Sequence, residues 1–115
     1  MTNEQFETIA NKLLDHAATV RTNKAAEYAS DTDRLRNFRK AAALASVEVP
    51  AAITGMMLKH TVSIYDMVDN VYTQHMGAYT DDIWLEKLGD QINYLLLLYA
   101  AIVEDREPND DTIPN

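Results

Sequence analysis

The stretch of residues 84–103 constrains the fold most, because it reads as one long helix that is apolar over most of its surface. At about 100° per residue, Glu86, Asp90 and Asn93 fall on one narrow stripe of this helix, and leucine, isoleucine, tyrosine and valine cover much of the rest. Two carboxylates one turn apart can hold one divalent cation through oxygen atoms, which favours magnesium over zinc. The alternative is a solvated face on which both carboxylates only contact water.

Length and charge limit the classes of protein to which the chain can belong. A chain of 115 residues forms one domain with one modest core. Its formal net charge of −8 argues against a nucleic-acid-binding surface, which needs clustered lysine and arginine. Acidity fits cation binding, a soluble anionic surface, or a decoy that presents carboxylates to a DNA-binding partner. The lack of cysteine, of a secretion signal and of a membrane-spanning run favours a soluble cytoplasmic protein.

Helical periodicity recurs in three further segments, so we expect an all-α fold with the architecture of a four-helix bundle. Thr2 and Gln5 form a capping box that opens the first helix, and Pro50 stands in the first turn of the third. The first helix is expected to run from residue 3 past residue 20, the second over 33–45, the third over 50–71, and the fourth from a cap at Thr80 or Asp81.

The segments outside these helices define the domain. A change of chain direction is expected near residues 30–33, where cap and turn formers cluster. Residues 69–82 read as a loop and a candidate lid. We predict that residues 1–104 form a single helical domain and that residues 105–115 form a disordered acidic tail.

The third predicted helix carries an apolar stripe and a polar stripe side by side. The apolar stripe consists of Ile53, Met57, His60, Ile64, Met67 and Val71, and the polar stripe of Lys59, Ser63, Asp66 and Asn70. If this polar stripe faces that of the fourth helix, Asp66 can join Glu86 and Asp90 around magnesium while a lysine meets a phosphate oxygen. If both stripes face water, they form only structural ion pairs. His60, on the apolar side, is interpreted as a hydrogen-bonded core histidine, the alternative being a catalytic base.

Two surface features bear on partners. The only dense basic patch of the sequence consists of Arg34, Arg36, Arg39 and Lys40. It is either a solvated face or an edge that contacts phosphates or an acidic neighbour. The consecutive leucines at 95–98 project in every direction, and a four-helix monomer covers only one side of each helix. We therefore expect a homo-oligomer formed through the fourth helix, the alternative being that the first helix alone covers this edge.

Three segments together resemble a known family. They are residues 24–28 (KAAEY) with 36–38 (RNF), residues 57–66 (MLKHTVSIYD) and residues 86–95 (EKLGDQINYL). They look like small phage-encoded proteins of the nucleotide modification associated domain 1 type. That type is similar to the all-α nucleoside triphosphate pyrophosphohydrolases of the MazG and dUTPase superfamily. The likeness covers roughly residues 20–104 and implies a MazG-like helical bundle, oligomerisation and, for a phage protein, the host cytoplasm.

The resemblance also implies residues for a magnesium-dependent site, although the match is incomplete. The pyrophosphohydrolases carry Glu-Glu-x-x-Glu on one helix and Glu-x-x-Asp on the next. Glu86 and Asp90 match the first Glu and the Asp of the common Glu-Glu-Leu-Gly-Asp form, whereas Lys87 replaces the second Glu. The upstream helix offers Asp66 in place of a carboxylate cluster. Hydrolysis needs enough carboxylates to bind magnesium and activate water, and these three allow one metal ion.

Three functional hypotheses follow. The first is a nucleotide-binding protein with Mg²⁺ at Asp66, Glu86 and Asp90, which, as an enzyme, would use Glu86 and Asp90 to split a nucleoside triphosphate into monophosphate and pyrophosphate. Its substrate contacts would be Lys59, His60, Ser63 and Asn93. The second is a non-catalytic counter-defence protein that sequesters a nucleotide signal or inhibits a host nuclease through its acidic surface. The third is an oligomeric scaffold without a ligand.

Overall fold

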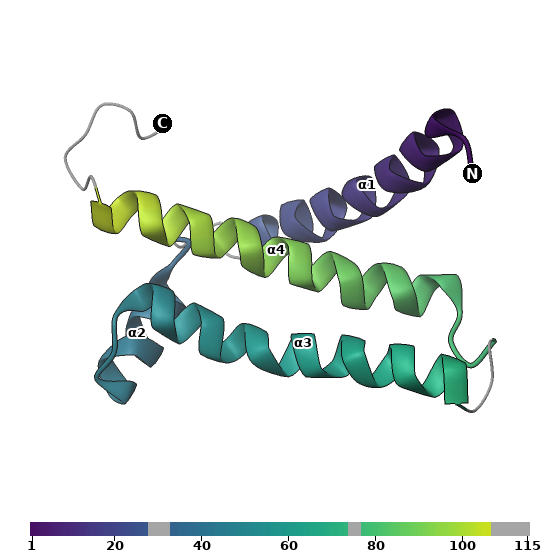
Figure 1. Ribbon diagram of the computed structural model, residues 1–115. Coiled ribbons are helices and arrows are strands. Elements are labelled where there is room, and N and C mark those ends of the chain that lie inside the picture. The colour runs from purple at the N-terminus through teal and green to yellow at the C-terminus, as the bar shows by residue number, and fades with distance from the viewer. Residues whose placement is uncertain (28–32, 74–76, 107–115) are drawn as a thin grey trace.

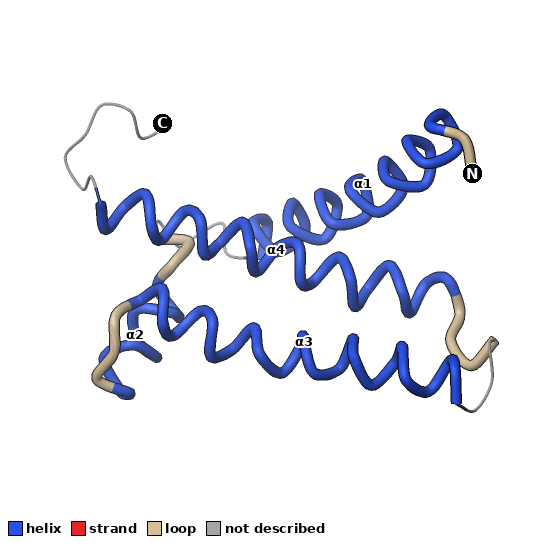
Figure 2. The backbone as a smooth tube through the Cα atoms, viewed as in Figure 1, coloured by secondary structure: helices blue, strands red, loops and turns tan. Residues whose placement is uncertain are grey.

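The described part of the chain is almost entirely helical (Figures 1 and 2). The computed structural model describes residues 1–27, 33–73 and 77–106. Its helices are α1 (Asn3–Glu27), α2 (Arg36–Ala45), α3 (Val49–Thr73) and α4 (Asp81–Arg106). No strand occurs among the described residues, so the all-α prediction is confirmed.

The predicted caps form at the starts of α1 and α4. The Thr2 backbone N–H donates to Gln5 Oε1 at 2.8 Å, and the Gln5 N–H donates to Thr2 Oγ1 at 3.1 Å. These two reciprocal bonds satisfy N–H groups that have no partner inside the helix. Thr80 Oγ1 accepts from the Ile83 N–H at 3.4 Å, which places the start of α4 where the sequence predicts it.

Three predicted boundaries differ from the structure. α2 begins three residues later than expected, because Asp33 and the two residues after it form a turn in which Asp33 Oδ1 accepts from the Leu35 N–H at 3.1 Å. α3 continues to Thr73, so the loop prediction is wrong for residues 69–73, and 74–76 lie outside the described residues. α4 continues to Arg106, so the tail prediction is wrong for residues 105–106, and 107–115 lie outside the described residues.

The helices form an open layer rather than a closed bundle. α3 and α4 are an antiparallel hairpin, α1 packs on α4, and α2 packs on the start of α3. Within the described ranges, the backbones of α1 and α3 make no close approach. Figure 1 shows the N-terminal half of α1 rising away from α4. Three large side chains on the apolar face of α1 are therefore exposed to solvent; they are Phe6, Ile9 and Leu14.

The buried core is small and lies where α2, α3 and α4 meet. Leu35, Ile53 and Ala101 form its centre, and Phe38, Val49, Tyr94, Leu97 and Leu98 pack around them. Six hydrophobic residues are buried in the described part of the chain, and three of these are alanines. Few large side chains are thus removed from water in a single copy of the chain.

The α3–α4 contact includes a polar pair that fixes its register. Gln91 Nε2 of α4 donates to Thr61 Oγ1 of α3 at 3.0 Å.

No single described helix is long and apolar enough to cross a membrane. α2 and α3 taken together pass the same test of length and composition, but the two helices meet at 97°.

Candidate functional site

All four helices contribute to one pocket of about 390 Å³. This volume lies in the range of sites for small molecules and cofactors. The pocket is on the side of the α3–α4 hairpin that carries α2. Its lining residues are Val20, Arg21, Lys24, Arg34, Asn37, Phe38, Met56, His60, Asp90, Asn93, Tyr94 and Leu97.

The lining of the pocket is cationic although the chain as a whole is acidic. Arg21 and Lys24 reach the pocket from α1, and Arg34 reaches it from the turn before α2. Asp90 is the one carboxylate among the lining residues that the structure describes. The chain contains 18 acidic and 10 basic residues, so this local excess of positive charge is opposite to its average composition. Such a concave, positively charged surface attracts an anion.

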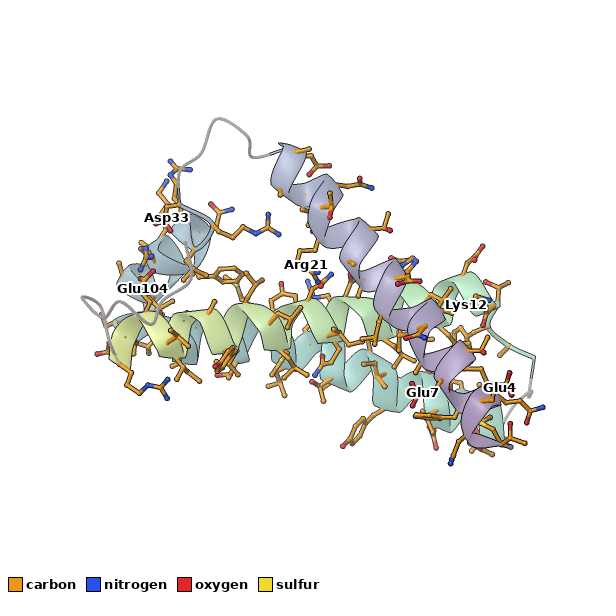
Figure 3. The ribbon with its side chains drawn as sticks, turned by 90° about the horizontal axis from the view of Figure 1, so that it is seen from above. Glu4, Glu7, Lys12, Arg21, Asp33 and Glu104 are labelled. Carbon is orange, nitrogen blue, oxygen red and sulfur yellow. The ribbon has the colours of Figure 1, made fainter. Side chains whose placement is uncertain are left out.

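Asn93 ties α1 to α4 and orients one of the cations. Its Nδ2 donates to the Ala17 carbonyl oxygen at 3.0 Å, and its Oδ1 accepts from Arg21 Nη1 at 3.2 Å. Figure 3 shows Arg21 between α1 and α4. The helices can come this close because α4 has Gly89 at the contact, where an added Cβ would lie 3.2 Å from His16 Cδ2. A guanidinium has five N–H donors, so one bond to Asn93 leaves others for a ligand.

A clamp of three charged residues holds the segment that carries Arg34. Arg39 of α2 donates through Nε to Asp33 Oδ2 at 2.7 Å, and its Nη1 lies 2.6 Å from Glu104 Oε1 of α4. The hydrogen bond from Arg39 lowers the pKa of Asp33 below its usual value, and the two carboxylates raise the pKa of Arg39. Asp33 and Glu104 lie at the same end of the molecule in Figure 3. The clamp thereby joins the start of α2 to the end of α4.

Three rings, those of Phe38, His60 and Tyr94, line the same pocket as these cations. The Tyr94 ring lies 4.8 Å from the His60 ring at an interplanar angle of 39°, and 6.2 Å from the Phe38 ring at 78°. These separations are typical of stabilising aromatic contacts. Together with the aliphatic lining residues, the rings offer a planar ligand an apolar surface.

The structure brings together three of the seven site residues that the sequence predicts. His60, Asp90 and Asn93 line the pocket. Lys59, Ser63, Asp66 and Glu86 are not among its lining residues, and of these four only Ser63 is not exposed. The amide of Asn93 is turned toward α1 and not toward the polar stripe of the third helix, which is one of the two arrangements that the sequence allows.

The carboxylates around the pocket do not by themselves fit a resident magnesium ion. Among the residues that the structure describes, no group of three or more His, Asp or Glu side chains is placed to hold a metal ion. Asp90 faces the pocket beside three cations, and a single carboxylate supplies only part of an octahedral oxygen shell. We therefore derive no catalytic step through a metal from this site.

Arg21 and Lys24 line the pocket but are not among the predicted site residues, although their spacing indicates that they face inward. They follow the buried Ala17 by four and seven residues, so they continue the inward stripe of α1 with cations in place of apolar side chains. A cation on an inward stripe points to a polar or anionic neighbour. Arg34 belongs to the basic patch whose alternative interpretation was an edge that meets phosphates, and it does line the pocket.

Comparison with known proteins adds no family to this geometry. No protein-family model, no curated protein and no solved structure matches the chain.

Proposed function

We propose that the protein binds a nucleotide, or an anion derived from one, in the pocket between its helices. The carrying observation is the cationic lining: three of the basic side chains converge on one concavity in a chain of net charge −8. Phosphate groups are the anions that guanidinium groups recognise best, through two parallel N–H···O bonds. The resemblance to the phage-encoded and MazG-like families points to the same ligand class.

The shape of the pocket supports a nucleotide rather than a bare inorganic anion. Phosphates would lie against Arg21, Lys24 and Arg34, and the base would lie against the rings of Phe38 and Tyr94. Aromatic side chains of this kind supply a stacking surface for a base. Asn37 and Asp90 are polar lining residues that can hydrogen-bond to base or ribose groups.

A binding assay with a matched pair of variants tests this proposal. The purified protein is titrated with a panel of nucleoside mono-, di- and triphosphates, and binding is followed by calorimetry and by the thermal midpoint. The variant Arg34→Gln removes a pocket cation, and Lys40→Gln removes an exposed cation of the same patch that does not line the pocket. Loss of one charged contact is worth about 1.5 kcal/mol, so Arg34→Gln should weaken binding roughly tenfold and Lys40→Gln should not.

Two results would remove the proposal. One is that no nucleotide in the panel binds or shifts the thermal midpoint. The other is that both variants weaken binding equally, because a diffuse charge effect, and not the pocket, would then account for the affinity. Mass spectrometry of the small molecules that co-purify with the protein gives an independent answer, and it also identifies the base.

We favour a protein that binds the nucleotide without hydrolysing it, and a magnesium-dependent hydrolase is the second candidate. Asp90 supports the latter, since magnesium in phosphate sites is commonly held by one or two carboxylates plus the phosphates of the substrate. Incubation with triphosphates and magnesium separates the two functions. Release of pyrophosphate that Asp90→Asn abolishes and Glu86→Gln preserves would identify the hydrolase. Recovery of unaltered nucleotide favours sequestration, as expected for a counter-defence protein.

A further inference from the structure

A continuous apolar surface covers the side of the α3–α4 hairpin that faces away from the pocket. We call this surface the back face; it consists of Leu58, Val62 and Tyr65 on α3 and of Leu95, Tyr99 and Ile102 on α4. Their exposed fractions, in that order, are 61, 51, 73, 48, 65 and 39%. None of these side chains carries a charge.

The register of the hairpin places both sets of side chains on the same side. The hydrogen bond from Gln91 to Thr61 and the ring contact between His60 and Tyr94 show which turns of the two antiparallel helices lie opposite each other. At about 100° per residue, Leu58 and Leu95 lie next to each other on the side opposite to His60. The back face is therefore one patch that crosses both helices.

A single copy of the chain leaves the core incomplete. The described residues bury six hydrophobic side chains, of which only Leu35, Ile53 and Met67 are larger than alanine. A domain of this length normally removes about two thirds of its surface from water. If another molecule covers the remaining apolar surface, it must be present whenever the chain folds. A second copy of the same chain meets this condition.

We infer that the back face is the interface of a homodimer. With about 200 Å² for a fully exposed tyrosine side chain and about 100 Å² for an aliphatic one, the six side chains leave about 475 Å² uncovered. Two copies would bury about 950 Å² from these side chains alone, which is close to the roughly 1,000 Å² that marks the lower limit of a specific interface. Because the patch has one stripe on each helix, a two-fold axis can lay the α3 stripe of one copy on the α4 stripe of its partner.

The charges of the chain argue against a membrane as the occupant of this surface. Helices that lie on membranes flank their apolar face with lysine and arginine, which contact anionic headgroups. Beside the back face on α3, the exposed charged residues are Lys59, Asp66 and Asp69, so acidic groups exceed basic ones there, and the net charge of −8 repels an anionic bilayer. The dimer is independent of what the pocket binds, since the two surfaces lie on opposite sides of the hairpin.

The test measures the mass of the full chain in solution and uses three substitutions. Light scattering over a dilution series should give twice the chain mass of 13.0 kDa for the unaltered protein. Val62→Glu on α3 and Tyr99→Glu on α4 should each abolish the dimer, because they bury a charge in the interface. Leu44→Glu is the control: Leu44 of α2 is 89% exposed and lies outside the back face, so its dimer should persist.

A folding measurement covers the case in which a back-face variant does not fold. If folding requires the dimer, the urea midpoint of the unaltered protein rises with protein concentration, and a midpoint that does not change contradicts the inference. A monomeric unaltered protein also overturns it, as does a dimer that Leu14→Glu on α1 disrupts while Val62→Glu and Tyr99→Glu do not. Binding of a monomer to phosphatidylcholine vesicles would show that lipid covers the face, and would overturn it equally.

Discussion

The two helical glycines offer a direct test of how closely α1 packs on α4. A Cβ added at Gly55 of α3 would meet nothing within 4 Å, whereas a Cβ added at Gly89 of α4 would lie 3.2 Å from His16 Cδ2 and 3.8 Å from Ala17 Cβ. Replacing a glycine by alanine within a helix is worth about 0.8–1.0 kcal/mol where space allows. Gly55→Ala should therefore gain this amount in full, which corresponds to an increase in the thermal midpoint of about 3–6 °C.

The same change at Gly89 should gain much less. The intrinsic helix preference is the same, but the 3.2 Å contact forces the His16 ring to shift by a few tenths of an ångström. We expect a net effect near zero for Gly89→Ala. Gly89→Leu adds three more carbon atoms at a helix contact without room for them, and overpacking of this kind costs about 1–3 kcal/mol. Since Arg21 and Lys24 belong to α1, a displaced α1 should also weaken ligand binding.

Urea unfolding followed by circular dichroism measures these changes, with all proteins at one concentration so that any dimer contributes equally. Ligand affinity is measured in parallel. Equal stabilisation by Gly55→Ala and Gly89→Ala, together with an unchanged stability of Gly89→Leu, would refute the close packing of α1 on α4. A destabilising Gly55→Ala would instead indicate that the second copy of the chain packs against Gly55, which lies three residues before Leu58 of the back face.

The remaining predictions concern the charged clamp and the first helix cap. Arg39→Gln should lower the free energy of unfolding by about 1 kcal/mol, a modest amount because its partners Asp33 and Glu104 are about two-fifths exposed; urea unfolding measures it. The pKa of Asp33 is lowered in the folded protein, so its contribution to stability is complete above the unfolded pKa, about 3.9, and is lost as the pH falls through the folded pKa. Unfolding curves between pH 7 and pH 3 should show this loss of stability. Arg39→Gln should make the loss smaller. Thr2→Ala removes the acceptor for the Gln5 N–H and should cost about 1 kcal/mol of α1 stability, detectable as faster amide exchange in the first turn.

The sequence predicts the helices well because caps and periodicity are local signals. The bonds between Thr2 and Gln5 and the cap at Thr80 depend on residues within three positions of each other. The weaker predictions are those at helix ends. The sequence predicts a loop at residues 69–73 because turn-forming polar residues are frequent from there on, yet these residues continue α3, since Val71 extends the apolar stripe and Asn70 Nδ2 donates to Tyr79 Oη at 2.8 Å.

The candidate site could be predicted only in part because it depends on how helices far apart in the sequence meet. Asp90 and Asn93 stand out as polar residues next to apolar positions of their helix, and His60 stands out as a polar residue within an apolar stripe; all three line the pocket. The approach of α1 depends on Gly89, whose role appears only when α1 is placed against α4. Without that placement, the inward stripe that Arg21 and Lys24 continue does not show which neighbour they face.

The position of a few cations inside an acidic chain has a kinetic consequence for any anionic ligand. Far from the protein, the ligand meets the field of eight net negative charges and is repelled. At 0.1 M salt the fields of exposed charges decay over about 10 Å, so the local field of Arg21, Lys24 and Arg34 acts only on a ligand that is already close to the pocket. Moderate salt should therefore speed encounter by screening the outer repulsion while it loosens the contacts inside. Occupancy of the pocket would then be governed by slow departure more than by fast capture.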